Sequence, residues 1–192
     1  MKELNNDVEK ISDHLTKKQN DFDTAMQLSR QMIRDAGQAI TLMHNNDKEE
    51  AKMKLEQMKK TGEQLYKFNA QFSHNTMQAY QEYAEAFIFF TIKTSRKIPT
   101  LSQVGVEQEA YLMGLMDVVG ELKREILESL RSNDLKSAEL HFDTMKEIYD
   151  STRRLRFAEA VLSGFRKKQD VARIQIENAG SEILSARHRH SK

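Results

Sequence analysis

Apolar residues recur along the first 43 residues at steps of three, four and seven. These steps place side chains on one narrow stripe of an α-helix, as in a coiled coil. The stripe consists of Leu4, Val8, Ile11, Leu15, Phe22, Ala25, Met32, Ala36, Ala39 and Met43. At about 1.5 Å per residue, a helix of this kind extends roughly 60 Å, which exceeds the width of a domain of this size. We therefore expect part of the stripe to pack on another copy of the chain.

The same periodicity predicts five further helices joined by short turns. We expect them at about 48–70, 73–97, 106–131, 135–149 and 151–179. Asp47 and Asp134 precede two of these segments and are suited to cap them. The only proline, Pro99, marks a break over 98–105, and Gly180 is a natural helix stop.

One proline and seven glycines in 192 residues, with abundant alanine, glutamate, lysine and leucine, also favour helices. Helices joined by short turns form antiparallel bundles. We predict an all-α antiparallel bundle of six or seven helices with a long N-terminal helix. The length suits a single domain over 1–192. We expect an ordered core over about 8–184 and a flexible tail over 185–192.

Net charge and cysteine content exclude only a few kinds of partner and site. The net charge of +1 favours no class of partner by itself. The absence of cysteine excludes disulfides, thiolate metal sites and a cysteine nucleophile, and it is compatible with a reducing cytoplasm. No apolar run approaches the roughly 20 residues that cross a bilayer, and the N-terminus is too polar for a signal peptide. We therefore expect a cytoplasmic protein without a membrane partner.

The two most apolar windows of the chain each carry a pair of acids. Glu82 and Glu85 are three residues apart, and Asp117 and Glu121 are four apart. Either spacing puts a pair on one face of a helix. A carboxylate in apolar surroundings is costly unless it is ion-paired, hydrogen-bonded or bound to a metal. If the two helices face each other, four carboxylates converge.

An all-oxygen ligand set of this kind suits Mg²⁺ or Mn²⁺. The alternative is that each acid is solvated or paired with a neighbouring lysine or arginine, and the spacing alone does not decide between the two. The six histidines show no metal-ligand or triad spacing, so we assign them no catalytic role. Gly114 and Gly120 lie inside a predicted helix, where glycine is unfavourable. They indicate tight packing or the close approach of another backbone.

Several stretches around these acids resemble the signature segments of the translin/Trax family. Residues 81–86 with 90–94, and residues 111–122, resemble its two signature helices, and residues 178–183 resemble its C-terminal helix end. The order of the helices is similar over about 8–184. The resemblance implies an all-helical protomer that assembles into a closed, hollow oligomer, often an octamer, and binds RNA or DNA. The chain lacks a longer insert between the two motifs, which is similar to the prokaryotic, mainly archaeal members that assemble alone.

In the Trax branch, the resemblance further implies a Mg²⁺-dependent endoribonuclease with acidic residues on the inner surface. Glu82, Glu85, Asp117 and Glu121 match those acidic positions, and translin itself lacks the full set, so the chain is Trax-like. We expect an endoribonuclease that cleaves mainly single-stranded RNA, with Mg²⁺ or Mn²⁺ held by these four acids. Duplex RNA and single-stranded DNA are further candidate partners. The alternatives are a non-catalytic oligomer that binds single-stranded RNA or DNA, and a helical scaffold that binds no nucleic acid.

Nucleic acid near four carboxylates requires cations to offset their charge. Arg30 and Arg34 share one helix face at positions i and i+4, and Lys93 follows the first acid pair. We predict that these three residues contact nucleic acid. Residues 153–173 contain seven basic residues against two acids, a second basic stretch. A solvated helix face or ion pairs between subunits would explain that stretch equally well.

Overall fold

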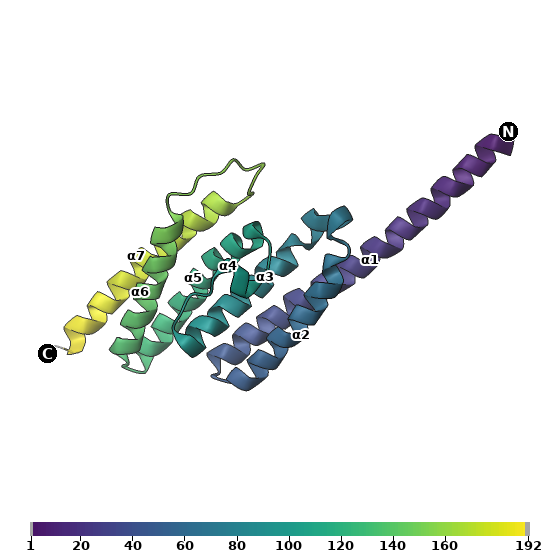
Figure 1. Ribbon diagram of the computed structural model, residues 1–192. Helices are drawn as coiled ribbons and strands as arrows, with labels where there is room; N and C mark the ends of the chain where they lie inside the picture. Colours follow the sequence, from purple (N-terminus) through teal and green to yellow (C-terminus); the bar gives the residue numbers. More distant parts are fainter. Residues whose placement is uncertain (1, 191–192) are drawn as a thin grey trace.

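Helices make up almost all of the chain in a computed structural model that describes residues 2–190 (Figure 1). They are α1 (Lys2–His44), α2 (Lys48–Tyr66), α3 (Asn69–Ser95), α4 (Leu101–Val104), α5 (Gln108–Arg131), α6 (Leu135–Thr152) and α7 (Phe165–His190). No strand occurs within 2–190, which confirms the predicted all-α fold. Within that range, no helix combines the length and the apolar character needed to cross a membrane.

The apolar stripe of α1 is divided between the protomer core and the surface. From Ala25 to Met43 its residues are buried, in contact with α2 and α3. Its first part projects beyond the bundle (Figure 1), and Leu4 and Leu15 are 64% and 54% exposed. The outer part of the stripe is therefore an uncovered apolar surface of the protomer.

Two turns use the same Asn-Asp dipeptide to connect antiparallel helices. Asn46 and Asn133 adopt left-handed backbone angles, with φ of 60° and 58°, a conformation that asparagine tolerates better than most residues. The Asp47 carboxylate then accepts a hydrogen bond from the Glu50 N–H at 3.2 Å. The Asp134 carboxylate accepts one in the same way at the start of α6. Both predicted caps are confirmed.

The predicted helix boundaries differ most from the structure near the C-terminus. A single helix over 151–179 is wrong, because α6 continues to Thr152, residues 153–164 are irregular, and α7 begins at Phe165. Gly164, with φ of 76°, ends the irregular segment. Gly180 is not a stop but lies inside α7, where a Cβ atom would come within 3.3 Å of the Phe142 ring. Its small size therefore serves helix packing.

Smaller differences occur elsewhere. Helix α2 ends at Tyr66, and α3 begins at Asn69 with a kink at Phe72. The predicted break over 98–105 contains the short helix α4, which Thr100 and Gln103 cap. Of the predicted tail, residues 185–190 belong to α7, while residues 191–192 lie outside the described part of the chain.

Helices α3 and α5 pack closely at the centre of the bundle because Gly114 has no side chain. A Cβ atom there would lie 2.8 Å from the Cβ of Ala84 and 2.9 Å from the backbone nitrogen of Glu85. The prediction of a close backbone approach is thus confirmed at Gly114, and the neighbour is α3. At Gly120 no neighbouring helix comes as close, because a Cβ atom there would lie 3.5 Å from the Gln175 side chain, an ordinary contact.

Candidate carboxylate site

Glu85 is the most buried of the four predicted acids. It lies on α3 opposite Gly114 and is 8% exposed. Burial, together with the negative charges of Asp117, Glu82 and Glu121, raises the pKa of Glu85 to about 9, and the charge of Lys168 acts in the opposite direction. No hydrogen bond or ion pair joins the Glu85 carboxylate to any residue within 2–190. The fold has therefore brought three other carboxylates near one that forms no ion pair within 2–190, and the charge of Lys168 offsets this cluster only partly.

Glu82 lies one turn before Glu85 on the same helix and is half-buried. Burial raises its pKa, and the charge of Asp117 adds to the effect, while a hydrogen bond from Gln78 and the charge of Lys168 act in the opposite direction. Glu82 is thus in electrostatic contact with both the acid on α5 and the cation on α7.

Asp117 is held from two sides. The Gln81 side-chain nitrogen donates a hydrogen bond to its Oδ2 at 2.7 Å, and the Lys168 ammonium forms an ion pair with its Oδ1. Lys168 comes from the first turn of α7. The neighbouring Gln169 anchors that turn by donating a hydrogen bond to the Thr152 carbonyl at 2.8 Å. The end of α6 therefore places a cation against the acid cluster.

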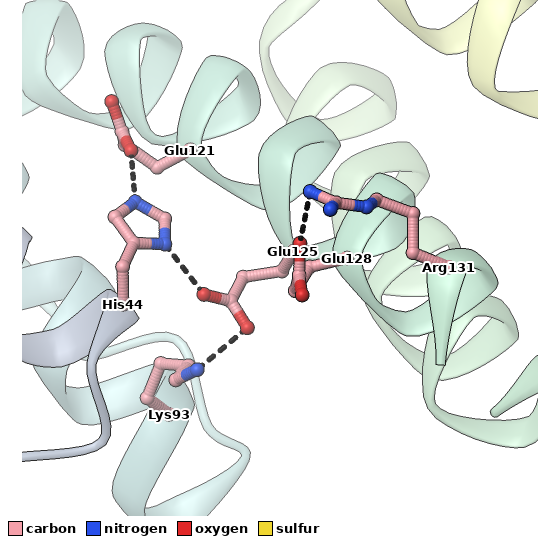
Figure 2. Close-up of polar contacts among 6 residues, drawn as sticks. All are labelled: His44, Lys93, Glu121, Glu125, Glu128 and Arg131. Atoms are coloured by element: carbon pink, nitrogen blue, oxygen red, sulfur yellow. Dashed lines mark hydrogen bonds and ion pairs between the residues drawn. The ribbon is translucent and has the colours of Figure 1, made fainter. Parts of the chain in front are cut away.

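Glu121 belongs to a chain of polar contacts that spans three helices (Figure 2). The Nε2 atom of His44 lies 2.5 Å from Oε2 of Glu121, and its Nδ1 atom lies 2.7 Å from Oε1 of Glu125. The other oxygen of Glu125 accepts a hydrogen bond from the Lys93 ammonium at 2.6 Å. The ends of α1 and α3 are thereby tied to the second half of α5 beside the acid cluster.

Burial alone would lower the pKa of His44, but its hydrogen bonds to Glu121 and Glu125 outweigh burial and raise it. For Glu125, burial alone would raise the pKa, but the hydrogen bonds from His44 and Lys93 prevail and lower it. His44 is therefore protonated more readily than a free imidazole, and its protonated form offsets the charge that Glu121 brings to the cluster.

Sequence reasoning placed none of the histidines in this site, and it missed His44, Glu125 and Lys168. For Glu125 a signal existed, because it continues the i, i+4 spacing of Asp117 and Glu121 on α5. His44 and Lys168 had no such signal. They reach the acids from helices distant in sequence, and Lys168 was one basic residue among several.

The residues predicted to contact nucleic acid differ in their exposure and in the hydrogen bonds and ion pairs that they already form. Arg30 and Arg34 are exposed on α1, and Arg34 donates a hydrogen bond to Gln31 at 2.6 Å. Lys93 is 10% exposed and engaged with Glu125. Nucleic-acid contact by these residues stays a prediction, and for Lys93 it would require sharing the ammonium with Glu125.

The acid cluster fits a divalent cation in its chemistry and its charge. All four candidate ligands offer carboxylate oxygens, and their negative charge exceeds that of Lys168 and His44, the cations that pair with them. Two acids are neutralised by those partners, and no three acid or histidine side chains within 2–190 are arranged as a ready-made metal site. A bound cation would therefore compete with Lys168 for Asp117 and with His44 for Glu121.

Replacing His44 with alanine is expected to destabilise the protomer by about 1–3 kcal/mol, because Oε1 of the buried Glu125 and Oε2 of the half-buried Glu121 both lose their donor. The ring also packs 5.0 Å from that of Phe89, centroid to centroid. Urea unfolding at neutral pH measures the loss. His14→Ala is the matched control, since His14 is exposed on the same helix. Equal stability of the two variants would contradict a stabilising role for His44.

The architecture and the acid cluster together define a class: an all-helical protein whose central helices present carboxylates on one face. A family model described as the Translin family matches residues 3–180. The chain therefore belongs to the Translin family. It is also 30% identical over 182 residues to the uncharacterized protein MJ0175 of Methanocaldococcus jannaschii, with 91% of this chain and 80% of that protein covered.

Solved structures show the same fold. The crystal structure of AfC3PO superposes on this chain with a TM-score of 0.85 at 28% sequence identity. The match covers 96% of this chain and 99% of the AfC3PO chain. A structure of AfC3PO in complex with duplex RNA gives a TM-score of 0.84 at 28% identity, with 95% and 97% of the two chains covered. Apo-NeC3PO, at 20% identity with 93% and 96% covered, has a TM-score of 0.85 and supports the fold alone.

Proposed function

We propose that this protein binds RNA and cleaves it, mainly as single strands, in a reaction that depends on Mg²⁺ or Mn²⁺. The observation that carries the proposal is the burial of Glu85 among three other carboxylates without a cation partner within 2–190. Burial there is costly for the charged form of Glu85, so the carboxyl keeps its proton at neutral pH unless a cation compensates the charge. Membership of the Translin family and the AfC3PO complex with duplex RNA support RNA as the partner.

Glu82, Glu85, Asp117 and Glu121 would hold the cation. When bound, a divalent cation of this kind activates water and stabilises negative charge on a phosphodiester. Around it, Lys168 and His44 hold Asp117 and Glu121 in place and limit the repulsion between the acids. Arg30, Arg34 and Lys93 are the proposed contacts for RNA phosphates.

Assembly into a hollow homo-oligomer, as an octamer, is part of the proposal. The uncovered apolar stripe on the projecting part of α1 supports it, because exposed apolar side chains that line up on one helix face are typical of interaction sites. Burial of one such side chain contributes about 1.5–3 kcal/mol. An enclosed assembly would place the acids where only RNA that enters the shell reaches them.

A non-catalytic RNA-binding oligomer is the second candidate. The ion pairs of Asp117 with Lys168 and of Glu121 with His44 favour it, since both acids are neutralised without any metal. In that case the acid cluster would be structural, and RNA would bind through the basic residues alone.

Two assays on the same preparation separate these candidates. A labelled single-stranded RNA is expected to be cut with Mg²⁺ or Mn²⁺ and to stay intact with EDTA. RNA affinity, followed by fluorescence anisotropy, is expected to fall steeply between about 50 and 200 mM salt. Salt-sensitive binding without cleavage in either metal would support the non-catalytic candidate. Absence of binding at low salt would exclude both.

A further inference from the structure

A pocket of about 320 Å³ lies outside the acid cluster, at the end of the bundle where α2 and α6 begin. Its wall is built by the turn that precedes α2, by the end of α3 and by α6. Lys93 lines this pocket and also pairs with Glu125 (Figure 2). The pocket is therefore connected to the polar chain of His44 and Glu121, and of the residues that line it, Lys93 is also a proposed RNA contact.

Cations from two helices meet at this pocket. Lys48 is the first residue of α2, and Arg96 ends α3 with a left-handed φ of 57°. Both are exposed, and neither forms an ion pair with any residue within 2–190. With Lys93 they place three positive groups on one cavity.

Two acids also line the pocket, and they offset this charge only partly. Asp143 is already paired with Lys146 at 2.9 Å. Glu147 is exposed on the next turn of α6. Asp143 is paired with Lys146, and Lys93 is paired with Glu125. Among the remaining charged residues that line the pocket, Lys48 and Arg96 carry two positive charges and Glu147 carries one negative charge. The net charge of the pocket lining is therefore positive.

Neutral hydrogen-bonding groups complete the wall. His141 is half-buried; burial lowers its pKa, as do the charges of Lys93 and Arg96, while Glu125 and Asp134 act in the opposite direction. A neutral imidazole keeps one N–H donor at neutral pH. Ser137, in the first turn of α6, adds a hydroxyl beside the positive end of that helix dipole.

We propose that this pocket binds a phosphomonoester group. The planar fork of Arg96 and the ammonium of Lys48 suit a phosphate dianion, whose oxygens accept several charge-assisted hydrogen bonds at once. The volume is at the lower end of ligand pockets, about 300–1,000 Å³, and accommodates one small phosphorylated group. The group belongs either to a free nucleotide or to the 5′ end of an RNA strand. The inference does not depend on RNA cleavage.

Calorimetric titration of the wild-type protein with 5′-AMP and with adenosine tests the proposal. Binding of AMP and none of adenosine is expected. In the Lys48→Gln/Arg96→Gln variant, AMP affinity should fall at least about tenfold, because each charge-assisted contact contributes on that order. Lys52→Gln/Arg131→Gln removes the same charges from exposed sites that do not line the pocket and should leave AMP affinity unchanged.

The two sources of the phosphate are separated with RNA of one sequence, with and without a 5′-phosphate. A preference for phosphorylated RNA that the Lys48/Arg96 variant loses assigns the pocket to an RNA end. AMP binding without such a preference assigns it to a free nucleotide.

No binding of either ligand by the wild type, or equal binding by the pocket variant and its control, overturns the proposal. The Arg96→Lys variant, which retains the charge, checks that a loss does not reflect misfolding. Cleavage of 5′-hydroxyl RNA is expected to continue in the pocket variant, so failure here leaves the proposed function unaffected.

Discussion

Replacing Glu85 with glutamine will reduce metal-dependent RNA cleavage at least about 100-fold, since losing even an outer partner of a metal ligand costs about 10- to 100-fold. Glutamine keeps the volume of the buried side chain, so the packing of α3 against Gly114 is preserved. It removes the carboxylate that would bind the cation at the centre of the four acids. RNA affinity at neutral pH should stay the same, because Glu85 keeps its proton below a pKa of about 9 and the substitution removes no charge there.

Single-turnover cleavage of labelled single-stranded RNA in Mn²⁺, with anisotropy as the binding readout, measures both effects. Glu128→Gln is the matched control: it also removes one carboxylate from the central helices, but Glu128 is exposed and paired only with Arg131 at 3.2 Å (Figure 2). Its cleavage rate should remain at the wild-type level. Cleavage at that level by Glu85→Gln as well would mean that the acid cluster is not the catalytic site.

The second large effect concerns stability and pH in the absence of metal. The folded state raises the pKa of Glu85 to about 9 from 4.5, so between these values the folded protein keeps a proton that the unfolded chain has released. The free energy of unfolding must then decrease as pH rises through this window. At about 1.36 kcal/mol per pKa unit, the total effect is at most about 6 kcal/mol.

Urea unfolding in EDTA at about pH 5, 7 and 8.5 follows this change. Wild type should lose stability toward pH 8.5, whereas Glu85→Gln, which has no proton to release, should lose less and become the more stable protein at high pH. Glu56→Gln, an exposed acid on α2, serves as the control and should behave as wild type. Parallel pH profiles for wild type and Glu85→Gln would show that the Glu85 carboxyl is not buried as described.

Adding Mn²⁺ should stabilise the wild type more than Glu85→Gln. Saturation at 100 times the dissociation constant stabilises a protein by about 2.7 kcal/mol. Wild type should gain this at pH 8, and Glu85→Gln should gain much less. The comparison detects the cation by a readout other than cleavage.

Local sequence patterns were sufficient to predict most of the helices and to show that each pair of acids lies on one helix face. The heptad stripe of α1, the caps Asp47 and Asp134, and the spacings of the acid pairs depend on residues within one or two turns of each other. Gly114 was informative for the same reason, because glycine within a helix is unfavourable without a packing role. The predicted start of the last helix, at residue 151, was wrong. The residues that follow are of types common in helices, and they include several basic residues, but 153–164 are irregular in the fold.

The sequence by itself determined that the chain is helical, that its central helices carry two pairs of acids, and that it resembles the translin/Trax family. Only the tertiary structure decided which cations meet those acids. Lys168 reaches Asp117 across 51 positions of the chain, and His44 reaches Glu121 across 77. Helical periodicity describes which residues share a face, but the partner of a buried charge is selected by how whole helices pack, and that depends on every contact between them.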